Sequence, residues 1–424
     1  MIGSPRQRIA SLVGVKPTHV RVGRVFAIVL AGAGLQVLTQ TILARSLPKE
    51  EVGLFSLVLG ALPLLSTLTL LGQDASIVRF LTRSAARSDE SYAVGRHVRR
   101  VALAVVPLGA AIGLAGAGFY GLAGATAAAM IVLVASQNAV MIVTSVMRAL
   151  HRYERAMLGR WLPLIAVAVL LSAMRIAGAL TYERAVLALI VSFAASAVWL
   201  FLVRPGAGGA ETGRPVPSHV VREGFFLLGL SLSMSVMVAM DKMIIGKLLP
   251  YSELAVYATV FAVMKGFDFL FYSVTYVLMP RVNTVERVPL RSLNLWIAAA
   301  AALVALIYLT VGDAVIHWLY AGRYDAGAYL ILPFTLSGVL KLFYSVPSSI
   351  IIGRLPRPAL RSFLLFNLAG IVVNVALDLA LIVRMGILGA AIATAIAWGL
   401  RLGGGYAIML GFRHFITSRA PDAE

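Results

Sequence analysis

Charged side chains occur in the middle of several long apolar stretches of this sequence. The densest group is Asp241, Lys242, Lys265 and Asp268. If these stretches cross a membrane, an unpaired ionisable group there costs roughly a few kcal/mol and usually faces the protein interior or water, so it marks a candidate functional site. Lys265 and Asp268 are three residues apart and can pair on one face of a helix. A purely structural ion-pair network explains the group equally well.

Three further cations, Arg175, Lys341 and Arg401, have no acidic residue within one helical turn along the sequence. This surplus of positive charge suits an anion, because Arg can hold a pyrophosphate with a bidentate fork and Lys with a point charge. Arg175 and Arg401 lie near places where a span can end, so extension of their side chains to the membrane surface is an equally good interpretation. Lys341 lies in mid-span and is the stronger candidate.

Polar residues at helical spacing form two stripes in the apolar stretches. Gln36 and Gln40 make up the first stripe, and Asn367, Asn374 and Asp378 make up the second. Such side chains can hydrogen-bond sugar hydroxyls from a cavity wall, but they also join helices to one another. The carboxylates of all these groups, Asp241, Asp268 and Asp378, are candidates for ion coupling or for structural ion pairs.

The composition excludes a soluble protein. Of the 424 residues, 60% are hydrophobic and 13% are charged, whereas soluble proteins carry about 25% charged residues. The net charge of +19 is spread over short loops instead of a folded patch, which argues against nucleic-acid binding.

Several kinds of chemistry are excluded as well. Cysteine is absent, which rules out disulfides and thiolate metal sites. The sequence has no phosphate-binding Gly-rich loop with Lys and Ser/Thr, and no His-x-x-x-His spacing for a metal. We therefore expect no cofactor. Any energy source would be a gradient of H⁺ or Na⁺, the membrane potential or the substrate's own gradient.

Apolar runs long enough to cross a bilayer, which takes about 20 residues, occur twelve times. They lie near 25–44, 52–72, 101–121, 123–147, 162–180, 185–203, 224–246, 254–279, 293–312, 328–352, 362–383 and 387–411. The sequence predicts an all-α integral membrane protein with about twelve transmembrane helices. The first run is too long for a signal peptide and no small-residue cleavage site follows it, so we expect it to be retained.

Lys and Arg residues are distributed unevenly between alternate loops. The loops on the side of the N-terminus hold 26 of them, and those on the other side hold only 6. Because short cytoplasmic loops carry the excess of positive charge, we expect a multi-pass protein of the cytoplasmic (inner) membrane with both termini in the cytoplasm. The segment 74–83 has an apolar face and two arginines elsewhere, which indicates an amphipathic helix at the cytoplasmic surface.

The sequence resembles itself at a shift of 202 residues. Residues 42–55 fall on 244–257 with Ile, Leu, Pro and Glu identical, and Arg45 faces Lys247. An even number of spans in each half makes the two repeats parallel, with a cavity between them as the natural substrate site. A helix bundle without a transport role is the competing interpretation. The predicted domains are an N-lobe at 1–203, a cytoplasmic linker at 204–223 and a C-lobe at 224–424.

Six segments resemble the multidrug/oligosaccharidyl-lipid/polysaccharide (MOP) superfamily, nearest to its polysaccharide transporter branch, the O-antigen-type flippases. They are LARSLPKEEVGLFS (43–56), LLGQDASIVRF (70–80), Asp241-Lys242, Val256-Tyr257, Met279-Pro280-Arg281 and NVALDLALIVRMGILGAAIAT (374–394). The last segment is the most specific. The resemblance runs in order over nearly the whole chain.

The resemblance implies a rocker-switch transporter with two pseudo-symmetric six-helix lobes. It would move a polyprenyl-pyrophosphate-linked oligosaccharide across the cytoplasmic membrane by alternating access, for surface polysaccharide biosynthesis. The candidates for the cationic central cavity of this family are Arg175, Lys242, Lys265, Lys341 and Arg401. The implied partners are the lipid-linked glycan, membrane lipids and other membrane proteins of polysaccharide assembly.

Two other functions remain open. A cation-coupled multidrug antiporter of the same superfamily is disfavoured, because the drug antiporters carry an acidic residue early in the N-lobe and the span 25–44 has only Gln36 and Gln40. A membrane glycan polymerase or transferase would be expected to use large loops bearing acidic or Arg clusters. The loops opposite the N-terminal side are at most about a dozen residues long, so we expect a transporter and not an enzyme. Twelve spans also argue against the fourteen-helix lipid II flippases.

Overall fold

The computed structural model describes residues 17–78, 94–149, 152–203, 218–282 and 288–417. Within these ranges the chain is helical and contains no β-strand. The helices of the first half are α2 (Pro17–Ser46), α3 (Lys49–Leu70), α5 (Val94–Phe119), α6 (Gly124–Ala149), α7 (Tyr153–Ile176) and α8 (Tyr182–Val203). Those of the second half are α9 (Ser218–Leu248), α10 (Tyr251–Val263), α11 (Gly266–Arg281), α12 (Leu290–Tyr320), the 3₁₀ helix η1 (Asp325–Leu330), α13 (Ile331–Arg354), α14 (Arg357–Met385), α15 (Ile387–Gly411) and α16 (His414–Thr417).

The predicted spans all fall on these helices. Ten helices of the described ranges are long and apolar enough to cross a membrane by themselves, and the number rises to eleven if the bent pair α10 and α11 is counted as one span. The first predicted span, 25–44, lies on α2, a helix of 30 residues. The prediction of an all-α, multi-pass membrane fold is confirmed.

The structure corrects the prediction at one span. The run 254–279 was expected to be a continuous helix, but it is divided into α10 and α11, which are bent by 51° at the break. The break lies at Met264 and Lys265. Neither residue is a proline or glycine, so the usual sequence signal for a kink is missing at these two positions.

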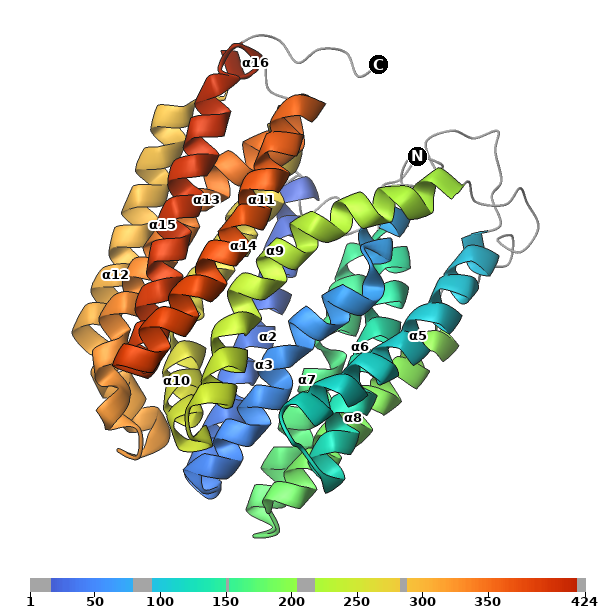
Figure 1. The fold of residues 1–424 in the computed structure, drawn as a ribbon, viewed down its shortest axis with the longest axis vertical. Helices are drawn as coiled ribbons and strands as arrows, with labels where there is room; N and C mark the ends of the chain where they lie inside the picture. Colours follow the sequence, from blue (N-terminus) through green and yellow to red (C-terminus); the bar gives the residue numbers. More distant parts are fainter. Residues whose placement is uncertain (1–16, 79–93, 150–151, 204–217, 283–287, 418–424) are drawn as a thin grey trace.

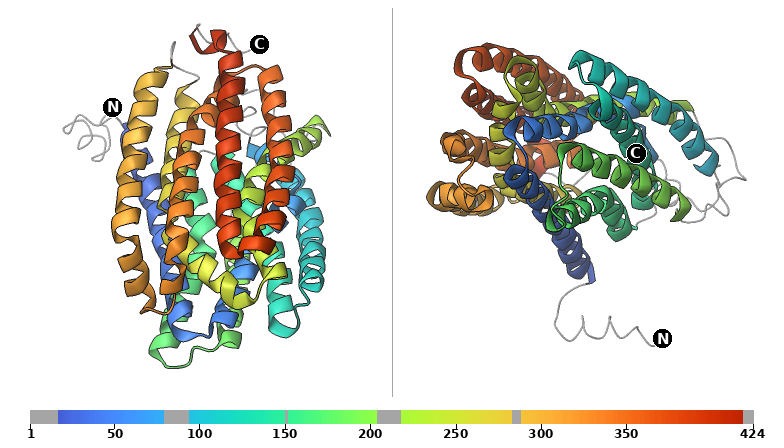
Figure 2. Two further views of the ribbon diagram at one scale, coloured as in Figure 1. Left: turned by 60° about the vertical axis from the view of Figure 1, so that its left-hand side comes forward. Right: turned by 90° about the horizontal axis from the view of Figure 1, so that it is seen from below.

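The helices form one bundle in which the two halves of the chain meet in the middle. Figure 1 shows α5, α6, α7 and α8 on one side, α12, α13, α14 and α15 on the other, and α2, α3, α9 and α10 between them. α3 packs along both α9 and α10, and α2 contacts α10, α11 and α12. α15 ends at the end of the bundle where α2 begins (Figures 1 and 2), and we call this the terminal end.

Two prolines that are 202 residues apart begin helices at the opposite end. Pro48 precedes α3 with φ −57° and ψ 151°, and Pro250 precedes α10 with φ −58° and ψ 147°. Proline fixes φ and lacks an N–H, so it fits at a helix start, where the first N–H groups have no intrahelical partner. The equal backbone conformation agrees with the sequence repeat at this shift.

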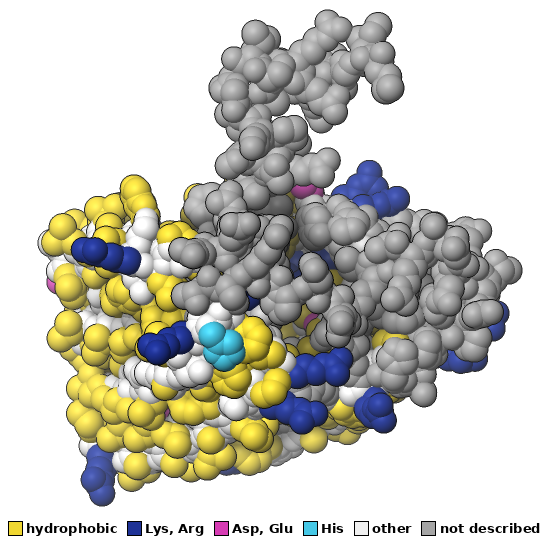
Figure 3. All heavy atoms as spheres, turned by 90° about the horizontal axis from the view of Figure 1, so that it is seen from above, with side chains coloured by type: hydrophobic (Ala, Val, Ile, Leu, Met, Phe, Trp, Pro, Cys, Tyr) yellow, Lys and Arg dark blue, Asp and Glu magenta, His cyan; other side chains and the backbone are white. Residues whose placement is uncertain are grey.

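Parts of three predictions lie outside the described residues. The structure describes the linker 204–223 only from Ser218, where α9 begins, and the amphipathic segment 74–83 only up to Val78, where it is helical. The basic N-terminal segment is described from Pro17 onward. Figure 3 shows Lys and Arg side chains around the described part of the terminal end, as the loop charges predict. The lobe boundaries stay a prediction.

Candidate functional site

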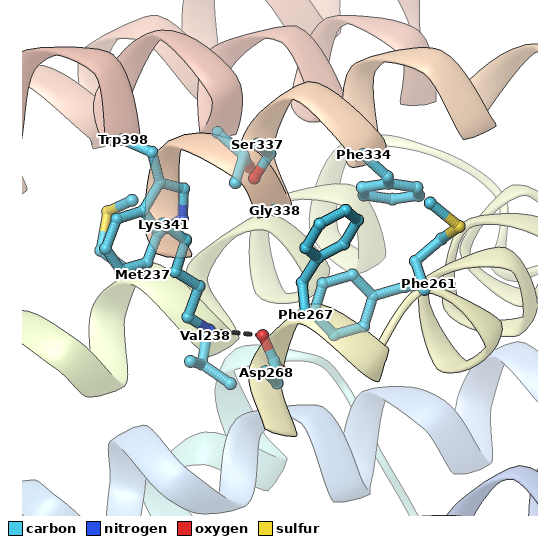
Figure 4. Close-up of a pocket in the computed structure, with 12 residues that line it drawn as sticks. Met237, Val238, Phe261, Phe267, Asp268, Phe334, Ser337, Gly338, Lys341 and Trp398 are labelled. Atoms are coloured by element: carbon cyan, nitrogen blue, oxygen red, sulfur yellow. Dashed lines mark hydrogen bonds and ion pairs between the residues drawn. The ribbon is translucent and has the colours of Figure 1, made fainter. Parts of the chain in front are cut away.

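Lys341 on α13 forms an ion pair with Asp268 on α11, with 2.5 Å between ammonium nitrogen and carboxylate oxygen (Figure 4). The side chains are 6% and 23% exposed. The rings of Phe271 and Trp398 each lie with their centroid 5.3 Å from the ammonium, within the range of a cation–π interaction. Lys341 has no acidic neighbour along its own helix, but the carboxylate of Asp268 on another helix pairs with it. Residue spacing within one helix does not reveal such a partner.

A narrow, largely aromatic pocket adjoins this ion pair (Figure 4). It is enclosed by α9, α10, α11, α13 and α15. The residues that line it are Met237, Val238, Phe261, Met264, Phe267, Asp268, Phe334, Ser337, Gly338, Lys341, Thr394 and Trp398. The pocket therefore combines an apolar wall with one charged end.

The break between α10 and α11 directs Lys265 toward the first half of the chain. Lys265 is the N-cap residue of α11, and its ammonium donates a hydrogen bond to the side-chain oxygen of Gln36 on α2. The expected pairing of Lys265 with Asp268 does not occur, because Asp268 pairs with Lys341. The helical spacing itself is kept, since the Lys265 carbonyl oxygen accepts a 2.9 Å hydrogen bond from the Asp268 N–H. The difference arises because α13 supplies a second cation that pairs with the carboxylate.

Lys242 on α9 completes a group of three lysines. Its ammonium lies 4.5 Å from the ring centroid of Phe261, and Lys265, Asp241 and Asp268 are near enough to act on it electrostatically. Among the described residues, no carboxylate lies within ion-pair distance of Lys242 or Lys265. We call Lys242, Lys265 and Lys341 the lysine cluster. Three cations around the single carboxylate of Asp268 leave a positive charge that suits an anionic ligand.

Asp241 on α9 lies in a separate buried network. One of its oxygens accepts hydrogen bonds from the hydroxyls of Tyr257, at 2.6 Å, and Thr394, at 2.5 Å. Asp378 on α14 is fully buried, is near enough to Asp241 to interact with it, and accepts a 2.9 Å hydrogen bond from the Asn374 amide. We call Asp241, Asn374, Asp378 and Thr394 the carboxyl network.

Three oxygens of the carboxyl network lack a partner. They are Oδ1 of Asp241, Oδ1 of Asn374 and Oδ1 of Asp378, none of which has a hydrogen-bond donor among the described residues. Buried polar atoms are almost always paired, and two neighbouring carboxyl groups cannot both carry a charge without compensation. The arrangement suits a proton or a hard monovalent cation bound by oxygens.

Arg401 and Asn367 lie together in a contact between helices. Arg401 on α15 is 1% exposed and donates to the backbone oxygen of Ser233 on α9 at 3.0 Å, and also to the Ser233 hydroxyl. Asn367 on α14 accepts hydrogen bonds from Tyr344 at 3.0 Å and from Ser233 at 3.4 Å. Full burial excludes extension of Arg401 to the membrane surface, and its bonds join α15 to α9.

Two candidates from the sequence lie apart from both groups. Arg175 is exposed one residue before the end of α7, so the structure does not bring it to the lysine cluster. Gln40 is buried and donates a 3.3 Å hydrogen bond to Ser56 on α3, which joins two helices of the same half. Of the first polar stripe, only Gln36 reaches the lysine cluster.

Sequence reasoning missed the hydroxyl and aromatic members of both groups. Tyr257 and Thr394 hydrogen-bond Asp241, and Trp398 covers the Lys341 ammonium. Such residues are common in apolar runs and carry neither charge nor a periodic pattern. Only the resemblance drew attention to two of them, to Tyr257 through the segment Val256-Tyr257 and to Thr394 through the segment 374–394.

The comparisons with known proteins agree with the fold. Residues 22–97 match a family model described as "Polysaccharide biosynthesis protein". The solved structure of the lipid II flippase MurJ in an inward closed conformation aligns with a TM-score of 0.66 and 12% identity, over 92% of this chain and 87% of that chain. An inward-facing multidrug resistance MATE family transporter of the MOP superfamily aligns with a TM-score of 0.61 and 18% identity, over 91% and 94%. No curated protein matches the sequence.

The described residues have the fold of the MurJ and MATE membrane transporter structures. The match of residues 22–97 agrees with the resemblance found in the sequence. The outward-facing conformation of a MATE family transporter aligns less well, with a TM-score of 0.52. The helices of this protein are therefore arranged more like those of the inward-facing MATE structure than those of the outward-facing one.

Proposed function

We propose that this protein is a flippase of the polysaccharide branch of the MOP superfamily, which moves a polyprenyl-pyrophosphate-linked oligosaccharide across the cytoplasmic membrane by alternating access. The observation that carries the proposal is the lysine cluster, in which three cations surround one carboxylate inside the helix bundle. A pyrophosphate supplies the missing negative charge and several acceptor oxygens. The family model matched by residues 22–97 supports a role in polysaccharide assembly.

Within the lysine cluster, the three cations differ in availability. Lys341 is already neutralised by Asp268. Lys242 and Lys265 have no carboxylate partner among the described residues, and Lys265 is bound only to the neutral Gln36. The pyrophosphate therefore binds Lys242 and Lys265 first, with the polyprenyl tail remaining in lipid through a gap between the two halves.

The carboxyl network supplies the ion coupling of this proposal. Its three unpaired oxygens and two neighbouring carboxyl groups fit H⁺ or Na⁺, which when bound compensates the buried negative charge. Asp241 is adjacent to Lys242 in the sequence on α9, so a cation bound beside Asp241 alters the field at the lysine cluster. The proposed partners are the lipid-linked glycan, membrane lipids and other polysaccharide-assembly proteins, and both termini are proposed to lie in the cytoplasm.

Purified protein in proteoliposomes tests this function. The vesicles carry a labelled polyprenyl-pyrophosphate oligosaccharide in both leaflets, and an added glycosidase digests the sugars that it reaches from outside. If the protein is a flippase, the sugars of the inner leaflet reach the outer leaflet and become accessible to the glycosidase over time. Arg384→Gln, which removes an exposed cation at the end of α14, serves as the control variant and keeps wild-type transport.

A multidrug antiporter is the second candidate, because a MATE family transporter aligns over 91% of this chain. Its cationic substrates need carboxylates, whereas the lysine cluster repels them. Ion exchange driven by a cationic drug in the same vesicles, together with no loss of sugar protection, would favour the antiporter. Formation of a glycan product from the labelled lipid would instead indicate a polymerase or transferase.

A further inference from the structure

The break between α10 and α11 leaves backbone groups without their helical partners. α10 ends at Val263 and α11 begins at Gly266. Inside a membrane no water satisfies such groups, so a broken helix persists only where side chains or neighbouring helices supply hydrogen bonds. A side chain from α12 does so here.

The hydroxyl of Tyr308 bonds to both sides of the break. It donates a 2.9 Å hydrogen bond to the Val263 carbonyl oxygen and accepts a 3.0 Å hydrogen bond from the Gly266 N–H. Gly266 allows this approach, because a Cβ at that position would lie 2.3 Å from the hydroxyl oxygen. The ring of Tyr308 packs against that of Phe267, with 5.5 Å between the centroids. One side chain thus supplies a hydrogen bond to a backbone group on each side of the break.

The break sets the direction in which α11 begins, and Lys265 is the N-cap residue of α11. Lys265 and Asp268 lie within one helical turn, since the Lys265 carbonyl oxygen accepts a 2.9 Å hydrogen bond from the Asp268 N–H. The Lys265 ammonium nevertheless bonds to Gln36 on α2, and Asp268 pairs with Lys341 on α13. The ammonium of Lys265 is thereby directed toward the first half of the chain.

We propose that Tyr308 is a positioning residue of the anion site. It holds the α10–α11 break so that Lys265, at the start of α11, presents its charge between the two halves of the protein. The inference rests on the proposed function, since it takes a pyrophosphate as the anion. Tyr308 itself does not touch the anion and acts through Lys265.

A double-mutant cycle tests this role with farnesyl pyrophosphate as the probe and farnesol as the control ligand without charge. Tyr308→Phe keeps the ring and removes both hydrogen bonds. We expect it to raise the Kd for farnesyl pyrophosphate roughly tenfold, as Lys265→Gln does, and the double variant to bind no more weakly than Lys265→Gln alone. Tyr406→Phe is the matched control and keeps the wild-type Kd. It removes a 2.8 Å hydrogen bond that the hydroxyl of Tyr406 on α15 donates to Asn294 on α12, the helix that also carries Tyr308.

The outcomes separate the two levels of the proposal. If Tyr308→Phe and Lys265→Gln weaken binding additively, or if Tyr308→Phe leaves the Kd unchanged, the positioning role is refuted while the proposed function stands. If the wild-type protein does not distinguish farnesyl pyrophosphate from farnesol, the proposed function itself fails. Thermal unfolding in detergent confirms that each variant is folded. If Tyr308→Phe does not fold, the single variant Lys265→Gln still measures the contribution of Lys265 to anion binding.

A second, independent observation concerns the end of the bundle opposite the terminal end. Arg45, at the end of α2, donates to the carbonyl oxygens of Leu319, at 2.7 Å, and of Trp318, in the last turn of α12. Arg323, just after α12, donates to the carbonyl oxygens of Ala44, at 2.7 Å, and Leu47, at 2.9 Å. The two helix ends hold each other through reciprocal cation–carbonyl bonds, which helix C-termini favour.

The repeat places a similar contact on the other pair of helices. Lys247, which the shift of 202 residues aligns with Arg45, donates to the carbonyl oxygen of Phe119 at 2.7 Å. Phe119 is the last residue of α5, the third span of the first half, as α12 is the third span of the second. Tyr120 adds a 3.0 Å hydrogen bond to the Met243 carbonyl. In each half, the cation that ends the first span therefore binds the end of the third span in the opposite half.

We infer that these contacts are two repeat-related latches that keep this end of the transporter closed, and that both open together when the halves separate here. Single bonds of this kind are weak at a membrane surface. Two latches between the same pair of rigid halves reinforce each other, because breaking one leaves the other in place.

The absence of cysteine in this chain makes the test direct. Cysteines introduced at the exposed positions Ile176 and Arg384, at the ends of α7 and α14, carry spin labels on opposite halves. We expect Arg45→Gln with Lys247→Gln to shift the distance distribution in lipid toward longer values, and Arg45→Lys with Lys247→Arg to restore it. Arg184→Gln removes a similar 2.8 Å bond to the Ala179 carbonyl within one half and leaves the distances unchanged.

A distance distribution unchanged in Arg45→Gln with Lys247→Gln would refute the latches. An equal shift in the Arg184→Gln control would also refute them, because it would show a general loosening of helix ends. If the double variant does not fold, Lys247→Gln alone gives the same test for one latch.

Discussion

Thr394 on α15 donates a 2.5 Å hydrogen bond to Asp241 and also lines the pocket that contains the Lys341–Asp268 ion pair. One side chain therefore touches both the carboxyl network and the pocket beside the lysine cluster. In the proposed flippase, this adjacency gives an ion bound at the carboxyl network a short physical connection to the anion site. Coupling of this kind requires that both sites bias the same structural element, and α9 carries both Asp241 and Lys242.

Removal of a carboxylate from the carboxyl network should abolish ion dependence. We expect Asp378→Asn and Asp241→Asn to transport at a rate that no longer changes when Na⁺ is replaced by choline or when a protonophore is added. The physical reason is that a neutral amide leaves no charge for a cation to compensate. Asp313→Asn, which changes an exposed acid on α12, keeps the wild-type response. An unaltered ion response in Asp378→Asn would show that coupling occurs elsewhere.

Lys341 is expected to act mainly through its ion pair. Lys341→Met leaves the carboxylate of Asp268 without a partner in a mostly buried position and should cost about 3 kcal/mol of stability. Lys341→Met combined with Asp268→Asn removes both charges and should recover most of the melting temperature and of the transport rate. A stable double variant without any transport would contradict this, because it would show that Lys341 itself binds the substrate.

Lys242 and Lys265 are expected to contribute to binding more than to stability. Neither has a carboxylate partner among the described residues, so Lys242→Gln and Lys265→Gln leave no buried charge behind. Each should raise the KM for the lipid-linked glycan roughly tenfold, as expected for loss of a charge-assisted hydrogen bond. Transport measured over a range of substrate concentrations checks this, with Arg384→Gln as the control. Wild-type KM values in both variants would remove the basis of the cationic site.

Arg401 should prove important for stability and not for substrate affinity. Its guanidinium holds Ser233 on α9 through a backbone and a hydroxyl bond, a pair that the single ammonium of Arg401→Lys cannot reproduce from the same position. We expect a melting temperature several degrees lower, from a loss of roughly 2 kcal/mol, with an unchanged KM. A raised KM at an unchanged melting temperature would instead indicate contact with the substrate.

The spans could be predicted because the bilayer leaves little choice. A segment such as 387–411 has no alternative to a helix that satisfies its backbone in lipid, and α15 has these same bounds. Pro48 and Pro250, which the repeat aligns, adopt the same conformation before α3 and α10. These features depend on local sequence alone.

The partners of the charges could not be predicted, because they come from other helices. The break at Lys265 is followed by Gly266, but the side chain that bonds across it is Tyr308, which is 43 positions away from Lys265 on α12. The carboxylate of Asp268 pairs with Lys341 on α13 and not with Lys265. Arg401 resembles a free cation in the sequence, but the structure gives it Ser233 on α9.

The leaflet assay with a labelled polyprenyl-pyrophosphate oligosaccharide tests the central claim most directly. The account predicts that wild-type protein removes the protection of the inner-leaflet sugar, that Lys242→Gln combined with Lys265→Gln removes it far more slowly, and that Arg384→Gln behaves like wild type. If vesicles that contain folded wild-type protein protect the inner-leaflet sugar as fully as empty vesicles do, the claim that this protein is a flippase for such lipids is contradicted.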